Sequence, residues 1–205
     1  LTPIMGYADL LKEEIVDVDQ LKFLDRIING AQEMYELITK IINLMRLETG
    51  QLRLKKERIS LKKLMNESLR KKASFINLKN INLKTDIEDA EFKGDYSLLK
   101  DVLVNLIDNA IKFSDDRGVI EVTTESTSDY VTISVRDEGP GIKEEDQEEL
   151  FKTFSQTIEG RKKGGFGIGL SMVKMVVEKH KGEVSIDSTY GEGSTFTIKL
   201  PRGEV

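Results

Sequence analysis

At 205 residues, the chain is long enough for one large domain, or for a domain and a smaller element, with an ample hydrophobic core. It carries 31 basic and 36 acidic residues, and the net charge of −5 argues against a general nucleic-acid or anionic-membrane binder. Because the chain has no cysteine and a single histidine, His180, the composition excludes disulfides, thiol catalysis and metal sites rich in cysteine or histidine.

The first 50 residues have the hydrophobic period of a helical hairpin. Apolar residues from Leu21 to Met45 alternate steps of three and four, and positions 4, 11 and 15 mark one face of a shorter helix, broken at VDVD, residues 16–19. Two such helices leave an apolar side uncovered, which either a second copy or the rest of the same chain would cover. We favour a dimeric four-helix bundle in which the first helix is truncated.

After position 50 the period changes to a mixture of strands and helices. Alternating runs predict strands at 54–60, 81–87, 119–125, 130–136, 183–188 and 195–200. Helical patterns lie at 61–77, 96–113 and 168–181. Because the two do not alternate strictly, we predict an α+β fold with helices on one face of a mixed sheet. The predicted boundaries are a hairpin at 1–50, a linker and first strand at 51–57, and a second domain at 58–205.

A glycine-rich run, GGFGIGL, lies at 164–170, directly before the last helical pattern. Residues without side chains allow an anion such as a phosphate to reach the unpaired N–H groups of a helix N-terminus. A flexible hinge would explain an isolated run of this kind equally well. The run also ends a long segment, 138–166, that is charged and has little periodicity, which is typical of a functional or flexible loop.

Three polar residues share one face of the helical pattern 96–113. Within NLIDNAIKF, residues 105–113, Asn105, Asn109 and Lys112 are spaced four and three apart. Amide oxygens suit Mg²⁺ and an ammonium group suits phosphate oxygens, so this face predicts a site for a metal-bound phosphate. An exposed polar stripe is the alternative reading.

Two further glycine motifs follow strands. In DEGPGI, residues 137–142, Asp137 at a strand end can accept a hydrogen bond from a flat base that lies against the glycine backbone; a simple turn is the alternative. In YGEGSTF, Gly191 and Gly193 indicate a hairpin before the last strand.

Taken in chain order, the motifs NLIDNAIKF, DEGPGI, LFKTF (150–154), GGFGIGL and YGEGSTF resemble a known set. They are similar to the N box, first glycine box, F box and two later glycine boxes of the histidine-kinase catalytic domain, in the GHKL ATPase superfamily. The resemblance covers 58–205, while LTPIMGYADLL resembles the end of that family's H-box helix and 20–48 the second helix of its dimerisation hairpin.

This resemblance implies a sandwich of the GHKL, or Bergerat, type and the activity of a sensor histidine kinase in a two-component system. ATP and Mg²⁺ would be its cofactors, and its partners would be a second copy, bound through the hairpin, and the receiver domain of a response regulator. The γ-phosphate of ATP would pass to a histidine and then to an aspartate of the regulator. We expect a cytoplasmic fragment, with membrane anchoring of the parent protein left open.

The resemblance also implies roles for residues that match the motifs. Asn109 would be the Mg²⁺ ligand, Asp137 would accept the adenine amine, and 143–166 would form a lid over ATP. The implied nucleotide-binding residues are Asn105, Asn109, Lys112, Phe113, Asp137, Gly139, Gly141, Phe151, Phe154, Arg161, Lys163, Gly165, Gly167, Gly169, Leu170 and Thr195. Of these, Phe151 and Phe154 would anchor the lid; the cations at 161–163 would meet the γ-phosphate or form a solvated face.

One departure from the family pattern and one contrast with other members of the superfamily carry consequences. The phosphoacceptor histidine would lie upstream of Leu1, so we expect a fragment that cannot phosphorylate itself, and we expect His180 to be a structural residue at a helix end. ATP-hydrolysing relatives place a glutamate one turn before the magnesium asparagine, where this chain has Asn105, and an amide cannot take a proton from water. Phosphoryl transfer is therefore favoured over hydrolysis. The alternative is a non-catalytic dimeric scaffold with a degenerate nucleotide site.

Overall fold

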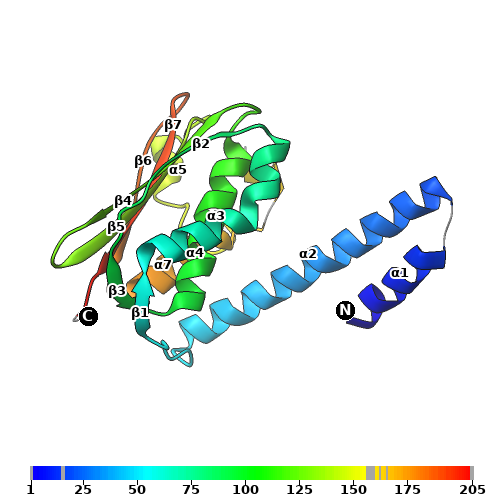
Figure 1. The fold of residues 1–205 in the computed structure, drawn as a ribbon, viewed down its shortest axis with the longest axis horizontal. Helices are drawn as coiled ribbons and strands as arrows, with labels where there is room; N and C mark the ends of the chain where they lie inside the picture. Colours follow the sequence, from blue (N-terminus) through cyan, green and yellow to red (C-terminus); the bar gives the residue numbers. More distant parts are fainter. Residues whose placement is uncertain (1, 15–16, 156–159, 162, 165, 204–205) are drawn as a thin grey trace. The chain divides into compact units, whose positions relative to one another are not determined.

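The computed structural model in Figure 1 describes residues 2–14, 17–155, 160–161, 163–164 and 166–203. The chain divides into two compact units, Leu1–Gln51 and Leu52–Val205. The first unit is helical, and the second combines helices with a mixed sheet, which confirms the predicted α+β class.

The first unit is a hairpin of α1 (Thr2–Glu14) and α2 (Val18–Glu48). Asp17 caps α2, because its carboxylate accepts the N–H groups of Asp19 and Gln20, so the second helix begins inside the VDVD segment. Position 15 lies outside the described residues. The part of the apolar seam that is exposed in the single chain lies in the second half of α2, at Tyr35, Ile38, Ile42 and Met45.

The second unit is built on a five-stranded sheet with the order β2-β4-β5-β7-β6. Its strands are β2 (Asn82–Asp86), β4 (Val119–Ser126), β5 (Tyr130–Asp137), β6 (Glu183–Thr189) and β7 (Gly193–Pro201). Strands β2 and β4 are parallel and the other neighbours antiparallel. A separate antiparallel pair joins β1 (Glu57–Ser60) to β3 (Glu91–Gly94), and β3 is not among the strands predicted from the sequence.

Helices cover one face of this sheet (Figure 1). They are α3 (Leu61–Leu78), α4 (Tyr96–Phe113) and α7 (Gly169–Lys179), while the short α5 (Glu144–Gln147) lies in the segment predicted to be a loop. The core between the layers is made of fully buried aliphatic residues such as Leu64, Leu103, Ile107, Ile133 and Ile198. Among the described residues, no helix is both long and apolar enough to span a bilayer.

The pleat of β5 brings a carboxylate to the helix-covered face. Val131, Ile133 and Val135 are buried there, and the same alternation places Asp137, the last residue of the strand, in the buried row. A charged side chain therefore ends a row of core residues, directly beside the end of α4.

Candidate functional site

The centre of the site is the buried carboxyl group of Asp137, whose residue is only 4% exposed. Its Oδ1 accepts the N–H of Gly139 at 2.9 Å. A Cβ atom at position 139 would lie 2.6 Å from that oxygen and 2.9 Å from the carbonyl oxygen of Phe113, so glycine allows the strand end to meet the end of α4. Burial raises the pKa of Asp137 to about 6, although the Gly139 N–H and the positive charge of Lys163 both lower it.

Two glycines at positive φ fix the DEGPGI loop against the β6–β7 hairpin. Gly141 has φ 64°, and a Cβ there would lie 2.0 Å from the carbonyl oxygen of Thr189. Gly193 has φ 112°, and its Cβ would lie 2.1 Å from the carbonyl oxygen of Asp137. The glycines of YGEGSTF therefore do more than turn the chain, because Gly193 lets the hairpin approach the main chain of the buried aspartate.

Two polar side chains that were not predicted from the sequence form hydrogen bonds that hold the DEGPGI loop in place. Ser188 Oγ accepts the N–H of Ile142 at 2.9 Å, and Gln147 Nε2 donates to the carbonyl oxygens of Ile142 and Ser188, both at 3.0 Å. A signal for Ser188 exists in the alternation of β6, where it follows Val184 and Ile186 in the more buried row.

The structure corrects the predicted role of Thr195. Residues pair across β5 and β7 as Asp137 with Ser194 and Arg136 with Thr195. Because neighbouring residues of a strand point to opposite faces, Thr195 lies on the uncovered face of the sheet, away from the Asp137 side chain. Ser194, which is buried and 2.9 Å from Ser188 Oγ, is the residue beside Asp137.

The asparagines of α4 lie on a half-buried face near the start of α7. Asn105 and Asn109 are each partly exposed, as their four-residue spacing predicts. A Cβ at Gly169 would lie 3.6 Å from Oδ1 of Asn105, an ordinary contact, so this glycine faces that amide without being required by it. Leu170 follows as the second residue of α7.

Two lysines lie at the C-terminal end of α4. Lys112 Nζ donates to the carbonyl oxygen of Gly164, while Lys163 Nζ donates to those of Lys112 and Phe113 at 3.0 and 3.1 Å. Both amines lie over the Phe113 ring, 5.3 and 5.6 Å from its centroid. Burial lowers the pKa of Lys112, and Lys163 adds to this effect while Asp108 opposes it. Two ammonium groups beside one ring, with only carbonyl oxygens as partners, favour the approach of an anion.

The middle of the predicted lid meets the residue just after the lid through their main chains. Phe154 donates its N–H to the carbonyl oxygen of Gly167 at 2.9 Å, and a Cβ at Gly167 would lie 2.5 Å from the carbonyl oxygen of Ser155. The Phe154 residue is 64% exposed and its φ is 64°, so its ring does not anchor the lid in this conformation. Phe151 is half-buried and Arg161 is exposed. Lys162 and Gly165 lie outside the described residues.

His180 has the surroundings of a structural residue. It is buried, its Nε2 accepts the N–H of Asp95 at 2.9 Å, and its Nδ1 lies 2.7 Å from the carbonyl oxygen of Val176. These partners require a neutral ring with the proton on Nδ1. Burial also favours the neutral ring, because it lowers the pKa of His180. Because both nitrogens are engaged, His180 is not available as a phosphoryl acceptor.

Comparison with known proteins assigns the class. Residues 94–204 match the family described as "Histidine kinase-, DNA gyrase B-, and HSP90-like ATPase", and the chain belongs to this ATPase family. Named relatives narrow the class to the ATPase catalytic domain of sensor histidine kinases. The circadian input-output histidine kinase CikA of Synechococcus elongatus is 34% identical over 89% of the chain, and the sensor protein GacS of Pseudomonas syringae is 32% identical over 98%.

Solved structures agree with this class. The histidine kinase AdeS of Acinetobacter baumannii aligns with a TM-score of 0.77 and 26% identity over 99% of this chain and 95% of its own. The chain spans only 25% of the length of CikA and 24% of that of GacS, so it corresponds to a part of these larger kinases.

Proposed function

We propose that this chain binds Mg-ATP and transfers the γ-phosphoryl group to a histidine, from which it passes to an aspartate of a response-regulator receiver domain. The observation that carries the proposal is the close approach of the buried Asp137 carboxyl and Gly139 to the carbonyl oxygen of Phe113, where two predicted motifs, DEGPGI and NLIDNAIKF, meet. A carboxylate held at a strand end, whose second oxygen has no hydrogen-bond partner among the described residues, suits an adenine amine as donor.

The residues around α4 fit the phosphate end of the nucleotide. Lys112 and Lys163 supply ammonium groups, and Asn105 and Asn109 supply amide oxygens. Mg²⁺ held by Asn109 would neutralise phosphate charge when bound. Among the described residues, no group of three or more His, Asp or Glu side chains is arranged to hold a metal ion, so most ligands of the ion would be phosphate oxygens and water.

The chemistry expected of these residues is positioning and charge neutralisation rather than proton transfer. Phosphoryl transfer needs the leaving oxygen and the attacking atom to lie in line on opposite sides of the phosphorus. It also needs the developing negative charge to be stabilised. Asn105 cannot act as a general base toward water, which supports transfer to another group rather than hydrolysis. Since His180 is buried and hydrogen-bonded on both nitrogens, the acceptor histidine in this proposal lies outside the 205 residues.

The helical hairpin supports the proposed assembly. The exposed residues Tyr35, Ile38, Ile42 and Met45 continue one apolar seam on α2, which a second copy would cover in a four-helix bundle. Light scattering over a concentration series should show a reversible dimer, and a chain that stays monomeric at the highest concentration would argue against this arrangement.

Labelled ATP tests the proposed activity. The chain should bind Mg-ATP without labelling itself, whereas a chain extended upstream to include a histidine-bearing helix should gain an acid-labile, base-stable phosphoryl group. Asn109→Ala in the extended chain should abolish labelling while leaving the helical hairpin folded by circular dichroism. Labelling of the present chain on His180, or no labelling of the extended chain, would overturn the proposal.

A further inference from the structure

One face of α3 differs in charge from the rest of the molecule. The helix, Leu61–Leu78, contains five basic residues and one acidic residue, in a chain whose net charge is −5. The acidic residue, Glu67, is paired with Lys100 at 2.8 Å, and Lys72 is paired with Asp108. The net charge of the whole chain therefore conceals a basic surface on this helix.

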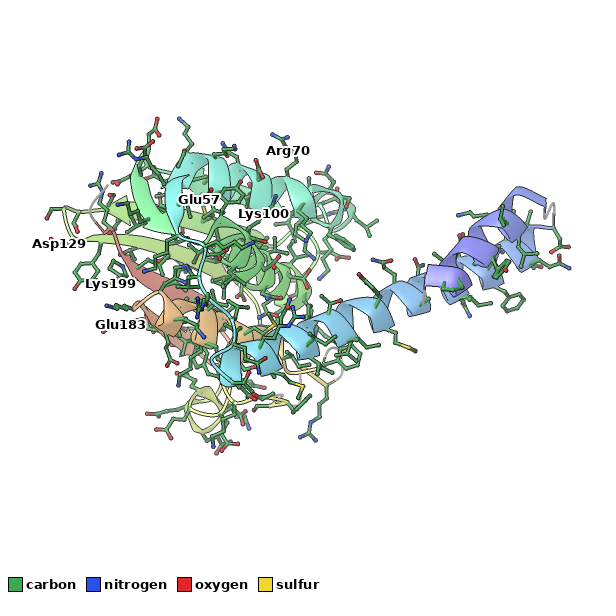
Figure 2. The ribbon with its side chains drawn as sticks, turned by 90° about the horizontal axis from the view of Figure 1, so that it is seen from below. Glu57, Arg70, Lys100, Asp129, Glu183 and Lys199 are labelled. Atoms are coloured by element: carbon green, nitrogen blue, oxygen red, sulfur yellow. The ribbon has the colours of Figure 1, made fainter. Side chains whose placement is uncertain are left out.

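Three of the other cations of the helix are exposed and have no acidic partner among the described residues. Lys62, Arg70 and Lys71 are exposed and form no ion pair with any described residue. Figure 2 shows Arg70 on the outer side of α3, directed away from the rest of the second unit. The opposite side of the helix is buried at Leu61, Leu64, Met65, Ser68 and Ile76, so the basic side is held outward by the core.

Two large apolar side chains lie on the same stripe of the helix as Lys71. Phe75 is 53% exposed and Leu78 is 78% exposed. With Lys71 they are spaced four and three residues apart, so all three lie along one stripe of the helix. Lys72 Nζ also lies 5.3 Å from the centroid of the Phe75 ring. We call Arg70, Lys71, Phe75 and Leu78 the α3 surface.

We propose that the α3 surface docks this unit on an anionic phospholipid membrane. Clustered lysine and arginine on a helix attract acidic headgroups, while exposed phenylalanine and leucine enter the boundary between headgroups and acyl chains. The exposed ridge of a helix, with cations that have no acidic partner, suits a deformable surface of negative charge. The proposal is independent of nucleotide binding, because Asn105 and Asn109 lie on a different helix.

Vesicle co-sedimentation tests the proposal with the full chain. Vesicles of phosphatidylcholine with phosphatidylglycerol should bind it, vesicles of phosphatidylcholine alone should not, and added salt should release it. The double variant Arg70→Glu, Lys71→Glu should weaken binding at least about tenfold. The matched reversal at two exposed lysines on other elements, Lys93→Glu with Lys199→Glu, should change it less than about threefold.

A second variant separates the apolar contribution. Phe75→Ser with Leu78→Ser should weaken vesicle binding several-fold while its salt dependence is kept, and nucleotide affinity should be unchanged in every variant. Equal binding to both kinds of vesicle, or equal loss in the two charge-reversal variants, would overturn the proposal. Concentration-dependent association without vesicles that the Arg70→Glu, Lys71→Glu variant abolishes would instead assign the surface to a protein contact.

Discussion

The base side and the phosphate side of the proposed nucleotide site are built from different kinds of contact. On the base side, the DEGPGI loop packs main chain against main chain, with Gly141 against Thr189 and Gly193 against Asp137. On the phosphate side, lysine amines of the α4 and lid segments reach carbonyl oxygens through long side chains, as in the contact of Lys163 with Phe113.

This difference has a physical consequence for how each side responds to change. Close main-chain packing leaves no room for an added atom, whereas a lysine side chain can move its amine to another acceptor at small cost in free energy. A rigid base pocket next to adaptable phosphate contacts would let the site select adenine before its cations rearrange around the phosphates.

The largest effect on stability should come from adding a side chain at Gly141, where the main chain of the hairpin lies closest. Gly141→Ala places a Cβ 2.0 Å from the Thr189 carbonyl oxygen at φ 64°, so the loop must move, and we expect a loss of more than about 2 kcal/mol in the free energy of unfolding and loss of nucleotide binding. Gly164→Ala is the matched control, because φ is 73° there and nothing lies within 4 Å. It should cost only about 1 kcal/mol. Denaturant unfolding that gave equal losses would contradict the comparison.

The next effect concerns the charge of Asp137. Because burial raises its pKa to about 6 from 3.8, folding favours the protonated carboxyl, and this contribution to stability is lost as the pH rises from about 4 through about 6. Asp137→Asn keeps an oxygen that accepts the Gly139 N–H and removes the charge. We therefore expect the variant to be more stable than the parent by about 1–3 kcal/mol at about pH 8.

The same variant should bind nucleotide less well, so Asp137→Asn is predicted to exchange binding for stability. Denaturant unfolding of both proteins at about pH 4 and about pH 8 would measure the first effect, and calorimetric titration with an ATP analogue the second. A variant that lost stability at the higher pH would contradict this expectation and would mean that the folded protein stabilises the carboxylate.

The fold and the motif set followed from the sequence because each depends on local pattern. The alternation that ends in Asp137 and the spacing of Asn105 and Asn109 are visible without a structure. The partners of the DEGPGI loop were not predictable in this way, because Ser188 and Gln147 contact it only after β6 and α5 are placed beside it.

Strand register was the second feature that could not be predicted from the sequence. A shift of one residue moves a side chain to the opposite face of a sheet, and only the pairing of β5 with β7 decides between Ser194 and Thr195 as the neighbour of Asp137. The two adjacent residues have similar chemistry, so composition could not distinguish them.

The smallest effect should separate the two sides of the site directly. Lys163→Ala removes an exposed amine that contacts the carbonyl oxygens of Lys112 and Phe113 at the C-terminal end of α4, so the free energy of unfolding should change by less than about 1 kcal/mol. If Lys163 moves to the phosphates when nucleotide binds, the variant should bind Mg-ATP about three- to tenfold more weakly and bind adenosine with unchanged affinity.

Asp137→Asn should weaken the binding of both ligands alike, because adenosine and ATP share the base. Lys152→Ala, an exposed lysine of the same segment paired with Glu149, is the control and should affect neither. Titration of each variant with both ligands gives the answer: an equal loss of adenosine and ATP in Lys163→Ala would mean that this lysine supports the base pocket through the end of α4, and the division of the site into a rigid base side and an adaptable phosphate side would fail.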